Sequence, residues 1–187
     1  WIYMVDFSVL ETTGTFIVDD LHVISSRNSQ AVIVGPDFIE PCSQGSSFSW
    51  SVPVEAPGNL ITDAYRKTDS QYYGVGDKLY SINTVPYSLD PISRYSPWPL
   101  NASSIAYGSA VFLVSTDHGI YRGPYDLTYL EIQPSTIGLD VRKVVFPGSS
   151  SSVGYAVCTG GRVLKTTNSG GAGVPYLSAF SFGDCEG

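Results

Sequence analysis

Charged side chains are scarce in this chain of 187 residues: they make up 14% of it, against roughly 25% in an average soluble domain. The net charge is −7, and the basic residues are scattered, with Arg66-Lys67 and Arg142-Lys143 as the only adjacent pairs. Nucleic-acid binding needs a concentrated basic surface that displaces counterions. The composition therefore argues against nucleic acid as a partner.

Long apolar runs and helical patterns are also missing. No apolar run approaches the ~18 residues that a membrane-spanning helix needs. No window of about 11 residues repeats its apolar positions with the helical period without Gly or Pro. The chain is rich in Tyr (13) and Phe (8), which favour strands, and in Gly (19) and Pro (12), which favour turns. The composition therefore predicts an all-β chain without a membrane span.

A hairpin pattern recurs along the chain at intervals of about 40 residues. In each copy an apolar run ends near a valine, a short turn follows, and a second strand begins. The valines are Val34, Val75, Val114 and Val157. The turns are centred on Gly35-Pro36, Gly76-Asp77, 117–119 and 159–161. We expect the hairpins to be equivalent strand pairs and the valines to be buried between sheets.

A further short apolar run precedes each hairpin and another follows it, which makes four strands in each period. This pattern is typical of a β-propeller blade, because a lone four-stranded sheet cannot bury both of its apolar faces and copies must stack. The predicted blades are 1–14 (truncated), 15–56, 57–100, 101–138 and 139–187. An ordinary β-sandwich with regularly spaced strands is the alternative.

The N-terminal residues resemble the third strand of a blade whose first two strands are absent. Residues 1–7 are rich in β-formers and almost uncharged, so they are unsuited to a free sheet edge. We therefore predict about four and a half blades of a larger propeller, with residues 1–7 paired on both sides. The neighbour is either the rest of a longer parent chain or another subunit.

One stretch resembles a known family. Residues 141–171, VRKVVFPGSSSSVGYAVCTGGRVLKTTNSGG, resemble blades of the photosystem II stability factor-like propellers and their Asp-box relatives, which include sialidases and sortilin-type receptor ectodomains. The Asp-box, Ser/Thr-x-Asp-x-Gly-x-x-Trp, is a turn between the third and fourth strands of a blade. Thr166, Asn168 and Gly170 match its first five positions, with Asn in place of Asp. Gly173 stands at the aromatic position.

A second Asp-box-like turn is degenerate. Ser115, Asp117 and Gly119 match the pattern, but they come one turn too early in the blade, and Arg122 replaces the Trp. The box is a structural turn whose acidic side chain binds local amides. The resemblance therefore implies a propeller fold and no particular activity.

A glycoside hydrolase is the enzymatic alternative. A sialidase-like site needs three converging arginines with a Tyr nucleophile and its Glu, but the chain's arginines are spread over all blades. They are Arg27, Arg66, Arg94, Arg122, Arg142 and Arg162. A general glycosidase needs two carboxylates at a set separation, which sequence spacing cannot place. The candidates are Asp19, Asp20, Asp63, Asp117 and Glu131, and none is assigned a catalytic role.

Metal and cofactor sites are not indicated. His22 and His118 are the only histidines and stand in no zinc-ligand spacing, and Asp19-Asp20 fits a solvated turn better than a cation site. An odd number of cysteines is consistent with reduced thiols, or with one disulfide and a spare thiol. The cysteines are Cys42, Cys158 and Cys185. We predict no metal and no cofactor.

Two features bear on sugars. Asn101-Ala-Ser103 is a glycosylation sequon, which makes Asn101 a candidate glycan acceptor. Six aromatic residues could form a sugar platform or, more simply, an inter-blade core. They are Trp50, Trp98, Tyr72, Tyr73, Tyr95 and Tyr129.

The composition and the repeats together favour a non-catalytic interaction or scaffolding module. Low charge with abundant Tyr and Ser suits contact with protein or glycan partners, in an extracellular or surface-exposed assembly. Two alternatives stay open: a fragment of a sialidase-like or other glycoside hydrolase, and a structural component of a large extracellular or virion assembly.

Overall fold

The computed structural model describes residues 23–27, 30–35, 38–44, 48–50, 54–55, 60–68, 70–84, 87–92, 101–168 and 183–184. Up to residue 55 and at 183–184 it defines the strands and not their side chains. These residues form four antiparallel sheets and, among the described residues, only short 3₁₀ turns of helix. The predicted all-β architecture of successive sheets is therefore confirmed, with four strands in three sheets and five in the first.

Each sheet is built from strands that follow one another in sequence, and we name the sheets blades I to IV. Blade I contains β1 (Val23–Arg27), β2 (Gln30–Gly35), β3 (Phe38–Gln44), β4 (Phe48–Trp50) and β5 (Val54–Glu55). Blade II contains β6 (Ile61–Arg66), β7 (Gln71–Gly76), β8 (Leu79–Thr84) and β9 (Tyr87–Pro91). Blade III contains β10 (Ala102–Gly108), β11 (Val111–Thr116), β12 (Gly119–Pro124) and β13 (Glu131–Ile132). Blade IV contains β14 (Val141–Val145), β15 (Gly154–Cys158), β16 (Val163–Thr166) and β17 (Gly183–Asp184).

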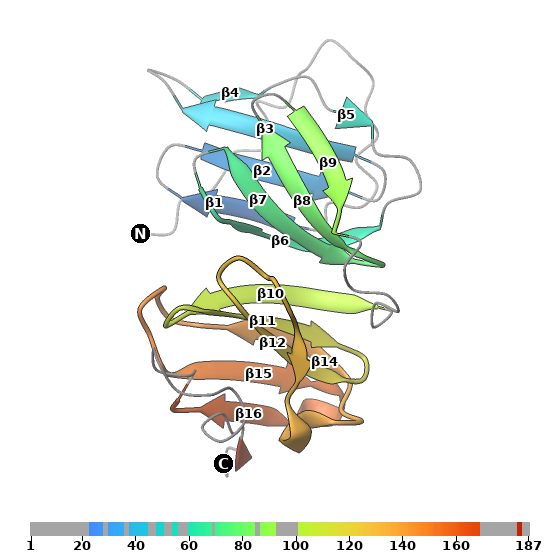
Figure 1. Cartoon of the computed structure of the whole chain (residues 1–187), viewed down its shortest axis with the longest axis vertical. Coiled ribbons are helices and arrows are strands. Elements are labelled where there is room, and N and C mark those ends of the chain that lie inside the picture. Colours follow the sequence, from blue (N-terminus) through green and yellow to red (C-terminus); the bar gives the residue numbers. More distant parts are fainter. Residues whose placement is uncertain are drawn as a thin grey trace.

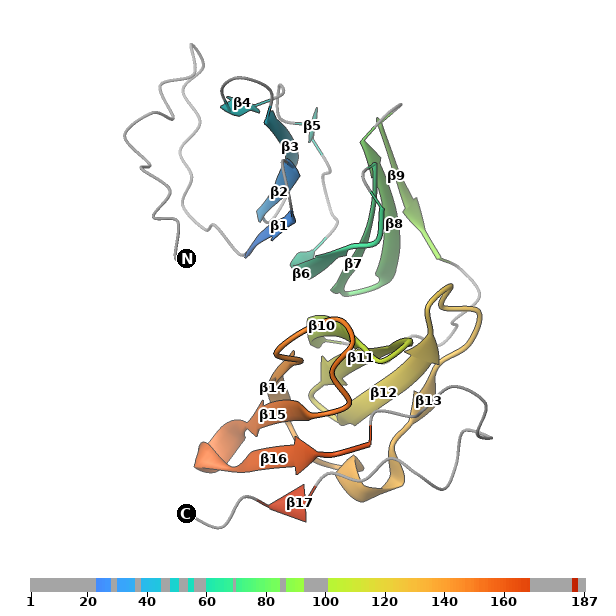
Figure 2. The ribbon, with the colours of Figure 1, turned by 90° about the vertical axis from the view of Figure 1, so that its left-hand side faces the viewer.

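The blades follow one another around a common centre. Blades I and II occupy the upper half of Figure 1, and blades III and IV occupy the lower half. Figure 2 shows the first strands β1, β6, β10 and β14 gathered at the centre, with the later strands of each blade spreading outward. Consecutive first strands contact each other, β1 with β6, β6 with β10, and β10 with β14. The four described blades thus form an arc in the order of the sequence.

The four predicted hairpins occupy equivalent places. They join β2 to β3, β7 to β8, β11 to β12 and β15 to β16, which are the second and third strands of each blade. The turn between β15 and β16 uses Gly160 and Gly161 at φ 79° and 82°, the left-handed region that glycine enters without strain. The prediction of equivalent strand pairs in successive blades is therefore confirmed for the hairpins.

A β-bulge in the first strand sets which positions of the blades correspond. The register between first and second strands shifts at Thr62 in blade II, at Ser103 in blade III and at Arg142 in blade IV. An extra residue on one strand bends it and re-aims its side chains. Beyond this bulge, Val75 of blade II pairs in the same way as Ser115 of blade III and Val157 of blade IV. Positions given below as equivalent follow this register.

The core consists of apolar clusters between successive blades. The cluster between blades II and III contains Tyr73, Val75, Leu79, Ala102, Ile105, Phe112, Val114 and Leu127. The cluster between blades III and IV contains Ala106, Leu113, Ile120, Val141, Val144, Ala156, Cys158 and Leu164. Blade III thus has one face packed on blade II and a forward face packed on blade IV.

The prediction that all the repeated valines are buried is wrong for Val157. Val75 and Val114 are fully buried, and the side chain of Val34 lies outside the described residues. Val157 is 45% exposed, because it lies on the forward face of the last described blade. Val114 stands one residue before Ser115, which is the equivalent of Val75 and Val157, so Val114 points to the other face of its strand and packs backward, against blade II.

Gly76→Ala is expected to lower the free energy of unfolding by about 3 kcal/mol, because overpacking strains a close-packed site. A Cβ at Gly76 would lie 1.7 Å from the carbonyl oxygen of Leu60, and backbone cannot move aside as a side chain can. Urea denaturation of both proteins measures the difference. Gly148→Ala is the matched control, since a Cβ at Gly148 meets no atom within 4 Å. Equal unfolding midpoints for the two variants would contradict this close approach of β6 and β7.

Candidate functional site

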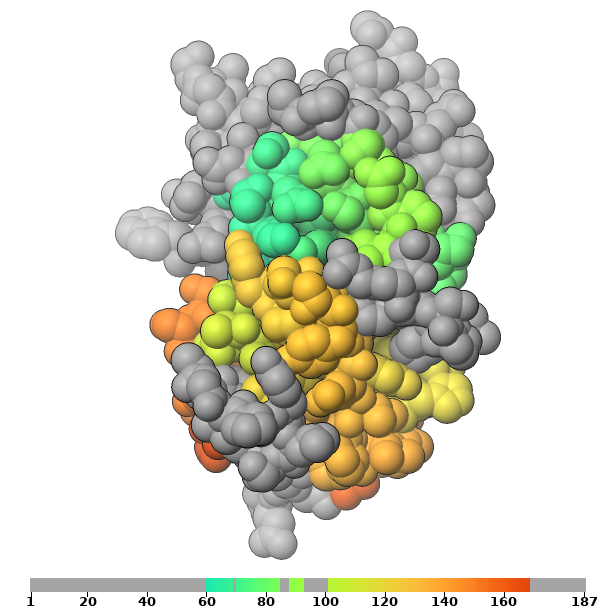
Figure 3. Space-filling view, viewed as in Figure 1, coloured from blue at the N-terminus to red at the C-terminus, as the bar shows by residue number. Residues whose placement is uncertain are grey.

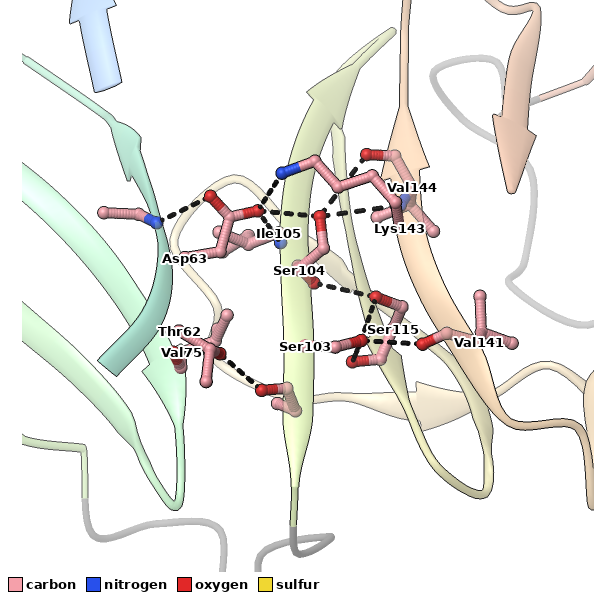
Figure 4. Close-up of polar contacts among 12 residues, drawn as sticks. Thr62, Asp63, Val75, Ser103, Ser104, Ile105, Ser115, Val141, Lys143 and Val144 are labelled. Carbon is pink, nitrogen blue, oxygen red and sulfur yellow. Dashed lines mark hydrogen bonds and ion pairs between the residues drawn. The ribbon is translucent and has the colours of Figure 1, made fainter. Parts of the chain in front are cut away.

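A buried carboxylate joins three consecutive blades. Asp63 in β6 is 3% exposed, and its Oδ1 accepts a hydrogen bond from the backbone N of Ala64 at 2.9 Å. Its Oδ2 accepts from Ser104 Oγ at 2.7 Å and from the backbone N of Ile105 at 3.0 Å, both in blade III. Lys143 Nζ of blade IV donates to the same oxygen at 2.9 Å (Figure 4). Three of the four donors converge on Oδ2 and come from the two following blades, so this group serves the packing of the blades.

The residues of this network occupy equivalent positions. Asp63, Ser104 and Lys143 each follow the bulge of their blade. Asp63 of blade II therefore contacts its own equivalents in the two following blades, Ser104 and Lys143. Lys143 keeps about half of its side chain in solvent, so its ion pair with Asp63 contributes less than a fully buried pair would.

The bulge residues make a second repeated contact. Thr62 Oγ1 donates to the carbonyl oxygen of Ala102 at 2.6 Å, and Ser103 Oγ donates to that of Val141 at 2.6 Å. Ala102 and Val141 are equivalent residues of the following blades, so one hydroxyl bond is repeated at both boundaries (Figure 4). Blade IV has Arg142 at this place, and its Nη2 donates to Asp140 Oδ2 at 2.7 Å.

The degenerate Asp-box-like turn lies in the hairpin between β11 and β12, where the sequence placed it. Thr116 Oγ1 donates to the carbonyl oxygen of Gly119 at 2.9 Å and accepts from the backbone N of His118 at 3.1 Å. Asp117 accepts from Asn101 Nδ2 at 2.8 Å and pairs with His118 Nδ1 at 2.6 Å. Partial burial would raise the pKa of Asp117, but the bonds from Asn101 and His118 together lower it below its usual value.

The better Asp-box match, residues 166–170, begins at the end of the third strand of its blade, which is where the Asp-box turn begins in the propellers that it resembles. Thr166 ends β16, the third strand of blade IV, and β17 is the fourth. The buried Thr166 Oγ1 accepts a hydrogen bond from the backbone N of Asn168 at 3.3 Å. Gly170 lies outside the described residues, so the assignment of this turn as an Asp-box stays a prediction. Glycosylation of Asn101 also stays a prediction: Asn101 is exposed, and its amide nitrogen donates to Asp117.

An exposed tyrosine, Tyr125, lies beside a lysine and buried aromatic rings where blades II and III meet. Lys67 Nζ lies 4.6 Å from the ring centre of Tyr73 and 5.4 Å from that of Tyr125, and it donates to the Tyr73 hydroxyl. The Tyr125 hydroxyl donates to the carbonyl oxygen of Lys67 at 2.8 Å. The Tyr125 ring stacks on Phe112 at 6.0 Å and meets Tyr107 edge-on at 5.2 Å. We call Lys67, Tyr73 and Tyr125 the Tyr–Lys surface.

The two blades contribute differently to the Tyr–Lys surface. Tyr73 is buried in the inter-blade core, whereas Tyr125 is 40% exposed. Figure 3 shows the segment after β12, which carries Tyr125, lying against the surface of blade II. Lys67 and Tyr125 are not predicted as a site from the sequence. The only available signals were the basic pair Arg66-Lys67 and a tyrosine directly after Pro124.

The candidate sugar-binding aromatics are mostly core where the structure describes them. Tyr72 and Tyr73 are buried between strands and blades, as the alternative interpretation had it. Tyr129 is partly buried. The side chains of Trp50, Trp98 and Tyr95 lie outside the described residues.

The candidate arginines and carboxylates are dispersed over separate elements. Arg66 ends β6, whereas Arg142 is the second residue of β14, so these two lie at opposite ends of equivalent strands. Arg122 is buried on β12, and Arg162 is exposed before β16. Glu131 is on β13. The side chains of Arg27, Arg94, Asp19, Asp20 and His22 lie outside the described residues.

The described residues hold no group of three or more His, Cys, Asp or Glu side chains placed to bind a metal ion. Cys158 is a buried free thiol, and the side chains of Cys42 and Cys185 lie outside the described residues. Within the same part of the chain, no helix is long and apolar enough to cross a membrane.

Comparison with known proteins shows the fold and does not reveal a sequence family. No family model matches the chain, and no curated protein matches it in sequence. Among solved structures, the computationally designed Ika4 protein matches with a TM-score of 0.59 at 8% identity, over 80% of this chain and 91% of that one. YCF48 from Cyanidioschyzon merolae matches with a TM-score of 0.56 at 10% identity, over 86% of this chain and 57% of that one. The WD40 beta propeller domain of Doa1 matches with a TM-score of 0.55 at 11% identity, over 80% of this chain and 52% of that one.

These likenesses define the class of the fold: the chain is a β-propeller. It spans little more than half of the length of the YCF48 and Doa1 chains that it matches. Four blades are described, and the predicted half blade at residues 1–14 lies outside the described residues.

Proposed function

We propose that this chain is a non-catalytic binding module that contacts a protein partner through the Tyr–Lys surface. The observation that carries the proposal is Tyr125, a large side chain that is 40% exposed although its ring rests on aromatic residues. Exposed tyrosines on a rigid base are typical of the residues that dominate protein interfaces.

The surface is preorganised for binding. The Tyr125 ring is held by Phe112 and Tyr107, and its hydroxyl is bonded to the backbone of Lys67. Ordering a free side chain on binding costs about 0.5–1.5 kcal/mol, and Tyr125 has already lost that freedom. Because the contact joins blades II and III, the surface depends on the stacking of the blades.

Charge indicates the chemistry of the partner. Although the chain as a whole carries a net charge of −7, Lys67 puts a local cation beside the rings of Tyr73 and Tyr125. A partner segment with an apolar or aromatic centre beside a carboxylate would match this arrangement. The carboxylate would pair with Lys67, and the apolar group would cover Tyr125.

In this proposal the Asp-box-like residues have a structural role: they hold turns and do not bind the partner. Thr166, Asn168 and Gly170 would close the β16–β17 turn, and Asp117 would hold the β11–β12 turn through Asn101 and His118. A glycan partner and an extracellular or surface-exposed setting remain hypotheses that rest on the low charge and the Asn101 sequon.

Site-specific photocrosslinking tests the proposed function. With a benzophenone amino acid in place of Asp126, next to Tyr125, we expect discrete adducts with a partner protein in extracts of the source organism. The same amino acid at Ile137, which is 62% exposed and outside the surface, is the control. Adding Tyr125→Ala should weaken partner binding at least tenfold, which corresponds to about 1.4 kcal/mol. Identical adducts at both positions, or adducts insensitive to Tyr125→Ala, would rule out this surface.

A further inference from the structure

The outer strands of blade II carry polar side chains on the face that turns toward blade III. Strand pairing puts Gln71, Asn83 and Ser88 in one line across β7, β8 and β9. Ser81 of β8 points to the same face, because residues two apart in a strand share a face and Ser81 pairs with Tyr73 of the core between blades II and III. We call Gln71, Ser81, Asn83 and Ser88 the polar ladder.

The polar ladder uses only part of its hydrogen-bonding capacity. All four of its side chains are half-buried. Gln71 Nε2 donates to Ser81 Oγ at 3.1 Å, and Asn83 Nδ2 donates to Ser88 Oγ at 2.9 Å. Within the described residues, Gln71 Oε1 and Asn83 Oδ1 accept no hydrogen bond. The ladder thus offers two amide oxygens to donors such as the backbone N–H groups of a peptide.

Opposite charges lie at the two ends of the polar ladder. At one end Lys67, which follows β6, holds its Nζ 4.6 Å from the ring centre of Tyr73. At the other end Asp90 of β9 is exposed, and its carboxylate forms no ion pair within the described residues. β6 and β9 are three strand spacings apart, which is about 14 Å. Four residues of extended chain cover about 13 Å and bring the first and fifth side chains to one face.

We propose that the partner of the Tyr–Lys surface continues across the polar ladder as an extended peptide segment, with a carboxylate at Lys67 and a cationic side chain four residues away at Asp90. In Figure 3 the surface of blade II (green) lies directly beside the segment that carries Tyr125 (gold). Backbone N–H groups of the peptide donate to Gln71 and Asn83, and an apolar side chain beside its acid covers Tyr125. Charges of opposite sign at the two ends select a dipolar segment.

This inference rests on the proposed function, and a peptide titration followed by the backbone amide resonances of the isotope-labelled 187-residue chain tests it. The probe is acetyl-Tyr-Glu-Ser-Thr-Ser-Lys-amide. We expect shifts confined to the polar ladder and the Tyr–Lys surface, and about fivefold weaker binding to Asp90→Lys. A second peptide with Glu in place of its Lys should bind Asp90→Lys as tightly as the first binds the wild type.

Lys78→Glu is the matched control. Lys78 is a half-exposed lysine of the turn between β7 and β8, where it pairs with Asp77, and its reversal should leave the affinity for the first peptide unchanged. The amide spectrum shows whether each variant is folded. Asp90→Asn replaces Asp90→Lys if that variant does not fold, and it should bind the two peptides equally.

Three results would overturn the inference. One is the absence of shifts on the polar ladder at millimolar peptide. Another is binding that Lys67→Gln weakens but Asp90→Lys does not, which would place the peptide on the Tyr–Lys surface alone. The third is a neutral sugar, cellotriose, that binds the ladder more tightly than the peptide does. Crosslinking from Asp126 and its sensitivity to Tyr125→Ala are unaffected by these results, so the proposed function and this inference fail separately.

Discussion

Val75→Asp is expected to prevent folding, whereas Val157→Asp, at the equivalent position two blades later, is expected to leave the chain folded. Val75 is fully buried in the cluster between blades II and III. An aspartate there would be an unpaired buried charge, which costs several kcal/mol out of a total stability of about 5–15 kcal/mol. Val157 is 45% exposed, and an aspartate in its place stays in water.

Far-UV circular dichroism and recovery of soluble protein measure the difference. Val157→Asp should give the wild-type spectrum, because the substituted side chain stays in water. A folded Val75→Asp protein, or a Val157→Asp protein that fails to fold, would contradict the assignment of the faces.

Asp63→Ala is expected to lower the free energy of unfolding by about 3 kcal/mol. The substitution leaves the buried Ser104 hydroxyl and the backbone N of Ile105 without their acceptor. Lys143 contributes little to the loss, because its half-exposed side chain can turn to water.

Asp140→Ala is the matched control, since it removes an acidic partner from an exposed arginine. Asp140 pairs with Arg142 at 2.7 Å on the surface, and such pairs are worth about 0–1 kcal/mol. Urea denaturation compares the two variants. Equal losses would show that the Asp63 network does not hold the blades.

The hairpins could be predicted from the sequence because turns and strand pairs are local. Gly76-Asp77 and the glycines at 160 and 161 mark chain reversals by their own backbone preferences. The bulges at Thr62, Ser103 and Arg142 could not be predicted, because Thr, Ser and Arg give no backbone signal for a bulge such as glycine can give. The valines differ in phase because Val114 lies one residue before Ser115, the equivalent of Val75 and Val157, and successive residues of a strand point to opposite faces.

The sites could be predicted only in part. Asp63 was one of several candidate acids, but its partners Ser104 and Lys143 are 41 and 80 residues away in sequence. Those separations are about one and two blade periods, so the repeat brings the three residues together once the blades stack. Lys67 and Tyr125 meet through a loop contact that follows no period, and only the packed structure reveals them.

A double-mutant cycle between Asp63 and Ser104 tests most directly that the chain stacks its blades in this register. The two side chains are bonded at 2.7 Å across the boundary between blades II and III. The unfolding free energies of Asp63→Ala, Ser104→Ala and the double variant should give a coupling energy of about 1–2 kcal/mol. Additive losses, with a coupling below about 0.3 kcal/mol, would show that these strands are not neighbours and would contradict the propeller arrangement.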